Sequence, residues 1–295
     1  MDLNEYQRET RVTDRVPGRD GNAILVPLLG LASETASLLS QHKKWLRDGP
    51  AHRLYAKQVA EELGDILWYT ANVADKFELD LDSVARDNLA KTRDRFPATD
   101  GSSRLTAPYL FDAAYAESER FPSQFVAKVA PAVGSDGVER TSLMIDGESV
   151  GDPLRDNAYE DDGFRFHDVL HLAHLAMLGW SPAMRRLLRR KRKSDPAVDE
   201  VEDGARARVI DEGIVAFVFD YARRHDWLEG VNSIDYELLR SLRSVTAGLE
   251  VGVRSAAEWE IAILTGYAIW RPIRARGFGT IAVDIEARSM RLVTD

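Results

Sequence analysis

Apolar side chains recur at intervals of three and four residues along the first third of the chain, which is the spacing of one face of an α-helix. The clearest stripe runs from Val59 to Phe77. Helices are expected over residues 3–13, 23–46, 51–78 and, from an N-cap at Asp80 or Asp82, up to Pro97. The pattern therefore predicts an all-α helical-bundle domain over residues 1–97.

The composition changes after this helical region. The stretch PATDGSSRLTAP is rich in Pro, Gly, Ser and Thr, which is typical of a linker. We therefore expect a linker over residues 98–108 and a second domain over residues 109–295.

The second domain begins with two segments, SQFVAKVAPAV and ERTSLMIDGESVG, in which apolar and polar residues alternate as in short strands. Asp146-Gly147 within the second segment is a hairpin-type turn. Helices are then expected over residues 164–178, 182–192, 201–224, 236–249 and 256–275. The predicted fold is mainly α, with a small β-hairpin near the start of a second, mainly helical domain.

The chain has 295 residues, no cysteine and a net charge of −9. The lack of cysteine excludes disulfides, cysteine-based zinc sites and thiol catalysis, and it fits a reducing cytosol. The net charge disfavours a general nucleic-acid-binding surface. The longest apolar run, residues 23–32, is too short to span a bilayer, and the polar N-terminus is unlike a secretory signal. We expect a cytoplasmic protein whose partners include neither a membrane nor nucleic acid.

The stretch AEELGDILWY places Glu61, Glu62 and Asp65 beside an apolar helix face. Glu62 and Asp65 are three residues apart and point the same way, and Glu61 nearly does. Glu34 interrupts the apolar segment of the preceding helix, so antiparallel packing of the two helices would bring it toward this pair. Carboxylates that converge without Lys or Arg partners repel one another unless a cation lies between them. Because the ligands are all oxygen, Mg²⁺ is expected, with Mn²⁺ as a substitute.

The next helix carries Asn88, Lys91 and Arg95 at spacings of three and four residues, so they form one polar, basic face. A metal–carboxylate cluster beside such a face can hold a polyphosphate, because the metal screens some phosphate oxygens and the basic side chains neutralise others.

In their order along the chain, these motifs resemble those of the MazG-like, all-α nucleoside triphosphate pyrophosphohydrolases. That family carries E-x-x-E on one helix and E-x-x-D on the next; GLASETAS is similar to the surroundings of the first motif, and EELGDILWY to the second. NLAKTRDRFP resembles the closing helix of the family, and LNEYQRET its N-terminal helix. The resemblance covers residues 1–97; the C-terminal half resembles no family that its motifs identify.

The resemblance implies Mg²⁺-dependent hydrolysis of a nucleoside triphosphate between its α and β phosphates, giving a monophosphate and pyrophosphate. It also implies a homo-oligomer, a dimer or a tetramer. The residues that these roles would fall on are Glu34, Glu62 and Asp65 as metal ligands, Glu34, Glu61 and Glu62 as candidate bases, and Asn88, Lys91, Arg95 and Gln7 as substrate contacts.

The chain departs from the family pattern at position 37, where Ser37 stands in place of the second acid of E-x-x-E. Glu61 could supply the missing carboxylate, fewer metal ions could bind, or catalysis could be impaired. The last case leads to an alternative function, a nucleotide-binding sensor whose second domain delivers the response.

The second domain has its own candidate site in FHDVLHLAHLAMLGW. His167, His171 and His174 lie within about 60° of one another on a helix of 3.6 residues per turn. This spacing suits a metal site, for which Glu212 is a candidate further ligand, with Glu202, Asp211 and His225 as other candidates. A second metal and a metal hydrolase centred here are therefore open alternatives. So are an HD-type phosphohydrolase, although no upstream histidine lies between residues 53 and 166, and a purely structural network of histidines and acids.

The run RRLLRRKRK, residues 185–193, holds seven basic residues in nine. It could contact a phosphate-rich ligand. The simpler interpretation is a solvated helix end balanced by the acids between Asp195 and Asp203.

Overall fold

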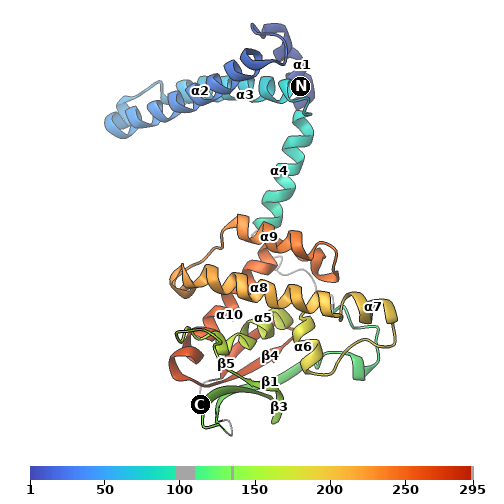
Figure 1. The fold of residues 1–295 in the computed structure, drawn as a ribbon. Coiled ribbons are helices and arrows are strands. Elements are labelled where there is room, and N and C mark those ends of the chain that lie inside the picture. The colour runs from blue at the N-terminus through green and yellow to red at the C-terminus, as the bar shows by residue number, and fades with distance from the viewer. Residues whose placement is uncertain (97–109, 134–135, 294–295) are drawn as a thin grey trace. The chain divides into compact units, whose positions relative to one another are not determined.

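Figure 1 shows the fold in a computed structural model that describes residues 1–96, 110–133 and 136–293. The chain divides into two compact units, Met1–Arg93 and Asp94–Asp295. The linker expected over residues 98–108 lies outside the described residues.

The first unit is all helical, as the apolar periodicity predicts. Its helices are α1 (Leu3–Thr13), α2 (Gly21–Asp48), α3 (Tyr55–Lys76) and α4 (Leu81–Arg95), the last of which continues two residues into the second unit. Helices α2 and α3 form an antiparallel hairpin (Figure 1). They approach closely at Gly30, because a Cβ atom there would come within 2.2 Å of the Tyr69 ring.

Little of the first unit is buried. Its buried apolar cluster consists of Ala71, Ala74 and Leu81, with Leu3 and Tyr6 packed against it. By contrast, many apolar side chains on the hairpin are exposed, among them Leu25, Leu29, Leu39, Leu46 and Leu63. The segment Gly21–Ala51 is long and apolar enough to cross a membrane by length and composition alone, and 11% of its most apolar window is buried.

The second unit contains a five-stranded antiparallel sheet with the strand order β3-β2-β1-β4-β5. The strands are β1 (Gln124–Val133), β2 (Glu139–Ile145), β3 (Glu148–Leu154), β4 (Gly279–Asp284) and β5 (Ser289–Val293). The predicted hairpin is β2–β3, and both residues of its turn have the positive φ that such turns require, 48° at Asp146 and 89° at Gly147. The sheet is larger than the expected hairpin, because the C-terminal β4 pairs with β1 and extends it.

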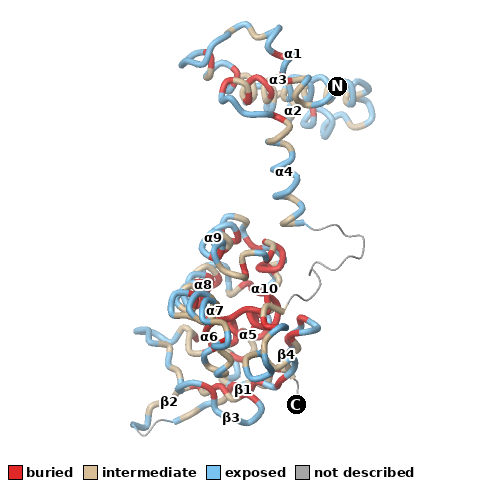
Figure 2. The backbone as a smooth tube through the Cα atoms, turned by 90° about the vertical axis from the view of Figure 1, so that its right-hand side faces the viewer, coloured by how far each residue is buried: buried red, intermediate tan, exposed pale blue. Residues whose placement is uncertain are grey.

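Helices cover one face of this sheet (Figure 1). They are α5 (Asp168–Leu178), α6 (Pro182–Leu187), α7 (Pro196–Val201), α8 (Ala205–Arg223), α9 (Tyr236–Thr246) and α10 (Ala256–Arg276). Helix α5 is buried from Val169 to Leu178 and packs against α10, so that these two helices form the centre of the core (Figure 2). The prediction of a mainly α fold is confirmed.

One expected helix, over residues 182–192, is shorter than predicted. Helix α6 ends at Leu187, and the backbone then turns through Arg189, whose φ is 56°. The turn lets Arg185 and Arg192 both reach the buried carboxylate of Asp203. Buried guanidinium groups need such partners, and a straight helix would carry Arg192 away from this acid.

Candidate functional site

The first unit brings three of the predicted acids together. Glu34 on α2 and Glu62 and Asp65 on α3 each offer a carboxylate oxygen, and these oxygens lie within 4.8 Å of one another. Glu34 and Glu62 are half-buried and Asp65 is exposed. Because α2 and α3 are antiparallel, the spacing of three on α3 and the single acid on α2 suffice to build the cluster.

The donor set of this cluster fits a hard divalent cation. No Lys, Arg or His forms an ion pair with the three acids within the described residues. Mg²⁺ takes carboxylate oxygens at about 2.1 Å, so oxygens this close can share one ion after small rotamer changes. Without a cation the three charges would repel one another.

Two residues beside the cluster were missed by sequence reasoning. Nε2 of Gln41 donates to Oε1 of Glu62 at 3.0 Å, and Nζ of Lys44 donates to Oε1 of Gln41 at 3.2 Å. Gln41 is buried, so its amide fixes the Glu62 carboxylate. Both residues could have been proposed from the sequence, because positions 34, 41 and 44 share one helix face.

Two other positions in this region bear on the site. Ser37, which stands where the family pattern has an acid, is half-buried on α2. Glu61 is exposed and is not part of the group formed by Glu34, Glu62 and Asp65. The pKa of Tyr6 on α1 is raised, chiefly by burial and also by the carboxylate of Asp65.

None of the expected substrate contacts is hydrogen-bonded or ion-paired to the three acids among the described residues. The amide of Gln7 is buried and used within the protein, since it donates to the Leu79 carbonyl (2.8 Å) and accepts from the Leu81 N–H (2.9 Å). Asn88 and Lys91 are exposed on α4. Arg95 follows the division between the units, with its guanidinium carbon 5.3 Å from the Tyr236 ring centre.

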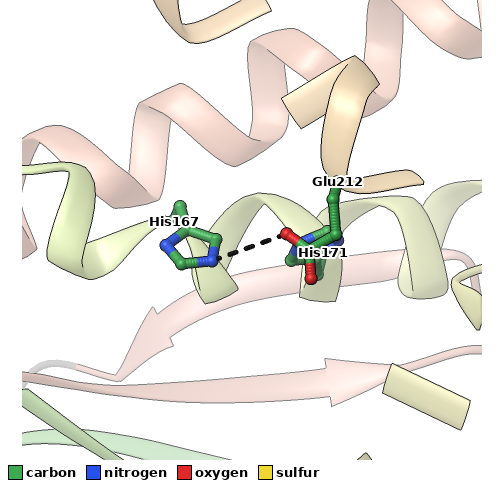
Figure 3. A group of neighbouring side chains, drawn as sticks. All are labelled: His167, His171 and Glu212. Atoms are coloured by element: carbon green, nitrogen blue, oxygen red, sulfur yellow. Dashed lines mark hydrogen bonds and ion pairs between the residues drawn. The ribbon is translucent and has the colours of Figure 1, made fainter. Parts of the chain in front are cut away.

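The second unit has a cluster built on the predicted histidine face. His167 and His171, one helical turn apart, meet Glu212 of α8 (Figure 3). Nε2 of His171 lies 3.2 Å and Nε2 of His167 lies 3.8 Å from Oε2 of Glu212. Burial lowers the pKa of His167, whereas the Glu212 pKa is lowered chiefly by its hydrogen bond with His171.

Behind this cluster lies a fully buried one, formed by His171, His174 and Asp211. Asp211 has no exposed surface, and it contacts Nδ1 of His171 at 3.1 Å and Nδ1 of His174 at 3.0 Å. Its other oxygen accepts from the Ser181 hydroxyl at 2.6 Å. Burial opposes charge on His171, but the carboxylates of Asp211 and Glu212 outweigh it and raise the pKa of His171 well above its usual value. His174 therefore contacts Asp211 and is buried away from the surface.

The helical hairpin with its converging carboxylates defines a class, that of all-α proteins equipped to hold a hard divalent cation on two packed helices. Comparison with protein families makes this specific. Residues 30–99 match the MazG nucleotide pyrophosphohydrolase domain, and residues 106–295 match the MazG C-terminal domain. The second match spans more than half of the chain, and the chain belongs to the MazG family.

Among individual proteins, the chain is similar to the Gene 37 protein of Mycobacterium phage L5, with 33% identity over 69 residues. This match covers 23% of the present chain and 60% of the phage protein, so less than two thirds of that relative is spanned. No solved structure matches the chain.

Proposed function

We propose that the protein is a Mg²⁺-dependent nucleotide pyrophosphohydrolase, which hydrolyses nucleoside triphosphates or related nucleotides to a monophosphate and pyrophosphate. The observation that carries the proposal is the convergence of Glu34, Glu62 and Asp65 within 4.8 Å, inside the part of the chain that matches the pyrophosphohydrolase domain. Mn²⁺ is the natural substitute, because it also prefers carboxylate oxygens.

In this proposal Glu34, Glu62 and Asp65 hold the cation, and Gln41 keeps the Glu62 carboxylate in place. The bound cation would polarise the phosphoryl group and lower the pKa of the attacking water. Glu61 is exposed beside the cluster and is free to orient that water or take its proton, which makes it the preferred base over Glu34 and Glu62. Lys44 brings positive charge next to Gln41 and would neutralise a phosphate oxygen.

We further propose that the active form is a homo-oligomer, a dimer or a tetramer. The buried apolar cluster of the first unit is very small, while Leu25, Leu29, Leu39 and Leu46 on α2 are 50% to 68% exposed. Covering an exposed Leu side chain contributes roughly 1.5–3 kcal/mol, so a second hairpin packed on α2 would gain much. Light scattering should give a mass above the 33.0 kDa of one chain, without detergent. A monomer that needs detergent to stay in solution would refute this and favour a membrane role for α2.

The catalytic proposal is tested by measuring pyrophosphate release from a panel of canonical and modified nucleoside triphosphates, with Mg²⁺ and with EDTA. We expect Glu62→Gln and Asp65→Asn each to lower turnover by at least about 100-fold, the upper end of the loss when a partner of a metal ligand is removed. Glu9→Gln, an exposed acid on α1, is the matched control and should leave turnover unchanged. Full turnover in both site variants, with unchanged circular dichroism, would refute the assignment.

The same assay separates the enzyme from a nucleotide-binding sensor. A sensor would bind nucleotide with Mg²⁺ present and release no pyrophosphate from any member of the panel. Ser37 is the residue that makes this outcome worth testing, since a neutral hydroxyl is a weaker ligand than the acid that the family pattern has there.

A further inference from the structure

Two sequence features that the proposed function does not use meet at one cavity of the second unit. The cavity has a volume of about 890 Å³, within the usual range for small-molecule sites. His167, Asp168 and Glu212 line one part of it. The basic run of residues 185–193 lines another part, through two of its arginines.

His167, which lines the cavity, and His171, which is buried next to it, each direct a ring nitrogen toward Glu212. Nδ1 of His167 lies 2.8 Å from the Phe164 carbonyl, which can only accept, so Nδ1 carries the proton and Nε2 offers a lone pair. Nδ1 of His171 faces the buried Asp211 carboxylate at 3.1 Å, which leaves its Nε2 directed to Glu212. A ring nitrogen held by a carbonyl or carboxylate, with the other nitrogen free, is how proteins orient metal-binding histidines.

The spacing of these groups also fits a metal ion. Ligands bound tetrahedrally at about 2.0–2.1 Å lie roughly 3.3 Å apart. The Glu212 oxygen lies 3.2 Å from Nε2 of His171 and 3.8 Å from Nε2 of His167, and the three ligand atoms all lie within 4.8 Å of one another, so modest side-chain movements would bring them to this spacing (Figure 3). Three protein ligands would leave the fourth position open toward the cavity, as in sites where a metal binds a further ligand.

Four of the five arginines of the basic run fall into two groups, and the fifth, Arg190, donates to the Glu117 carbonyl outside the cavity. Arg185 and Arg192 are buried and form ion pairs with Asp203, so their role is structural. Arg186 and Arg189 line the cavity, and neither guanidinium has an ion-pair partner within the described residues. Arg189 has a left-handed backbone conformation, with a φ of 56°, which is unfavourable in a residue other than glycine.

A third arginine, Arg208 of α8, also lines the cavity and likewise has no ion-pair partner among the residues described. The cavity lining also includes the acids Asp152, Asp168 and Glu212, but none of them forms an ion pair with these arginines among the described residues, so the three guanidinium groups remain available to an anionic ligand. The planar fork of arginine matches two oxygens of a phosphate group.

We propose that this cavity binds a small molecule carrying a phosphate monoester. A divalent transition-metal ion, held by His167, His171 and Glu212, contacts one phosphate oxygen, and Arg186, Arg189 and Arg208 hold the others. Imidazole ligands suit Zn²⁺ better than Mg²⁺, which sets this site apart from the acids of the first unit. The proposal does not depend on the pyrophosphohydrolase activity.

The metal part is tested by titrating Zn²⁺ into the full chain by calorimetry, in a Glu62→Gln background that weakens the first-unit cluster. We expect one Zn²⁺ per chain, and His167→Gln or Glu212→Gln should each weaken binding at least about tenfold. These two are preferred to His171→Ala, because removing a fully buried histidine beside Asp211 endangers the fold. His225→Gln is the control, since it lies 13 residues along from Glu212, roughly 20 Å in a helix. Equal Zn²⁺ binding in all four proteins would overturn the metal site and leave the histidines as structural.

The phosphate part is tested on the Zn²⁺-loaded protein, with inorganic phosphate and a 5′-mononucleotide as the probes. We expect Arg186→Gln with Arg189→Gln to weaken binding at least tenfold while Zn²⁺ affinity stays the same. Arg206→Gln, on α8 but outside the cavity lining, is the matched control. Tighter binding of the nucleotide would identify a nucleotide ligand, and equal binding would show that the phosphate group alone supplies the affinity; both support the proposal. Absence of binding by both probes, or binding that the arginine variants do not change, would overturn it.

Discussion

The division of the basic run into structural and ligand-facing arginines rests on Asp203, and replacing this residue by asparagine tests it. Asp203 is 2% exposed. Its oxygens accept from the backbone N–H of Arg192 at 2.7 Å and from the guanidinium of Arg192 at 2.7 and 3.2 Å, and one of them lies 3.4 Å from Nε of Arg185. Asparagine keeps the shape and one acceptor oxygen, but it removes the charge that both arginines share.

Breaking a buried ion pair costs about 3–5 kcal/mol, because the partner is left buried and charged. Here the lower end applies, since Glu250 still pairs with Arg192 at 2.7 Å. A domain of about 150–250 residues, the size of the second unit, loses roughly 2–4 °C in Tm per kcal/mol. We therefore expect Asp203→Asn to lower the Tm of this unit by about 6–12 °C.

The assay is differential scanning calorimetry of the full chain, which can record separate transitions for the two units. Asp199→Asn is the matched control, since Asp199 also pairs with a basic residue of the run, Lys191, but both side chains are about 30% exposed. An exposed pair contributes about 0–1 kcal/mol, so the control should change Tm by less than about 4 °C. If the two variants have the same Tm, the buried ion pairs of Asp203 do not stabilise this segment, and the structural assignment of Arg185 and Arg192 is wrong.

Three further predictions concern the first unit. Ser37→Glu should tighten Mg²⁺ binding by roughly tenfold in calorimetry, because ligand charge sets affinity; unchanged affinity would mean that position 37 faces away from the acids. Gly30→Ala should destabilise the hairpin by about 1–3 kcal/mol, because its methyl group clashes with the tyrosine ring on α3. Gly64→Ala meets open space and should stabilise the hairpin by up to about 1 kcal/mol. A higher Tm for Gly30→Ala than for Gly64→Ala would contradict this packing. Burial alone would raise the pKa of Asp14, but the Lys76 ammonium more than offsets this effect, so the pKa is lowered. The stability that the Asp14 carboxylate contributes is therefore present above the unfolded-state pKa of about 3.9 and is lost as the pH falls further. Asp14→Asn should make the stability of the protein depend less on pH in this acid range.

The first unit was predictable because its signals are local. Helix α1 has the predicted bounds, and the spacing of three between Glu62 and Asp65 is enough by itself to give the two side chains a common direction. The contribution of Glu34 needed only the assumption that neighbouring helices pack antiparallel. Gln41 was missed because an amide carries no charge to draw attention, although its distance of seven residues from Glu34 places it on the same face.

The second unit was harder because its main contacts join distant parts of the chain. Strands β4 and β5 are five or six residues long, and β4 is paired with β1 across about 150 residues. The early end of α6 depends on Asp203, an acid 16 residues beyond Leu187. Likewise Glu212 could be proposed as a partner for the histidines, but the arginines that share their cavity could not, because only the fold brings the end of α6 next to α8.

The ligands of the two clusters differ in a way that makes the sites chemically separable. Glu34, Glu62 and Asp65 offer oxygen alone, which suits Mg²⁺. His167, His171 and Glu212 combine two imidazoles with one carboxylate, and such a set favours Zn²⁺ or a similar ion over Mg²⁺ by ligand type. A chelator that strips Zn²⁺ in the presence of excess Mg²⁺ would therefore empty the second cluster and leave the first loaded. Since each unit has its own ligands, any change in pyrophosphate release under those conditions would measure coupling between the two sites, a quantity that neither cluster alone determines.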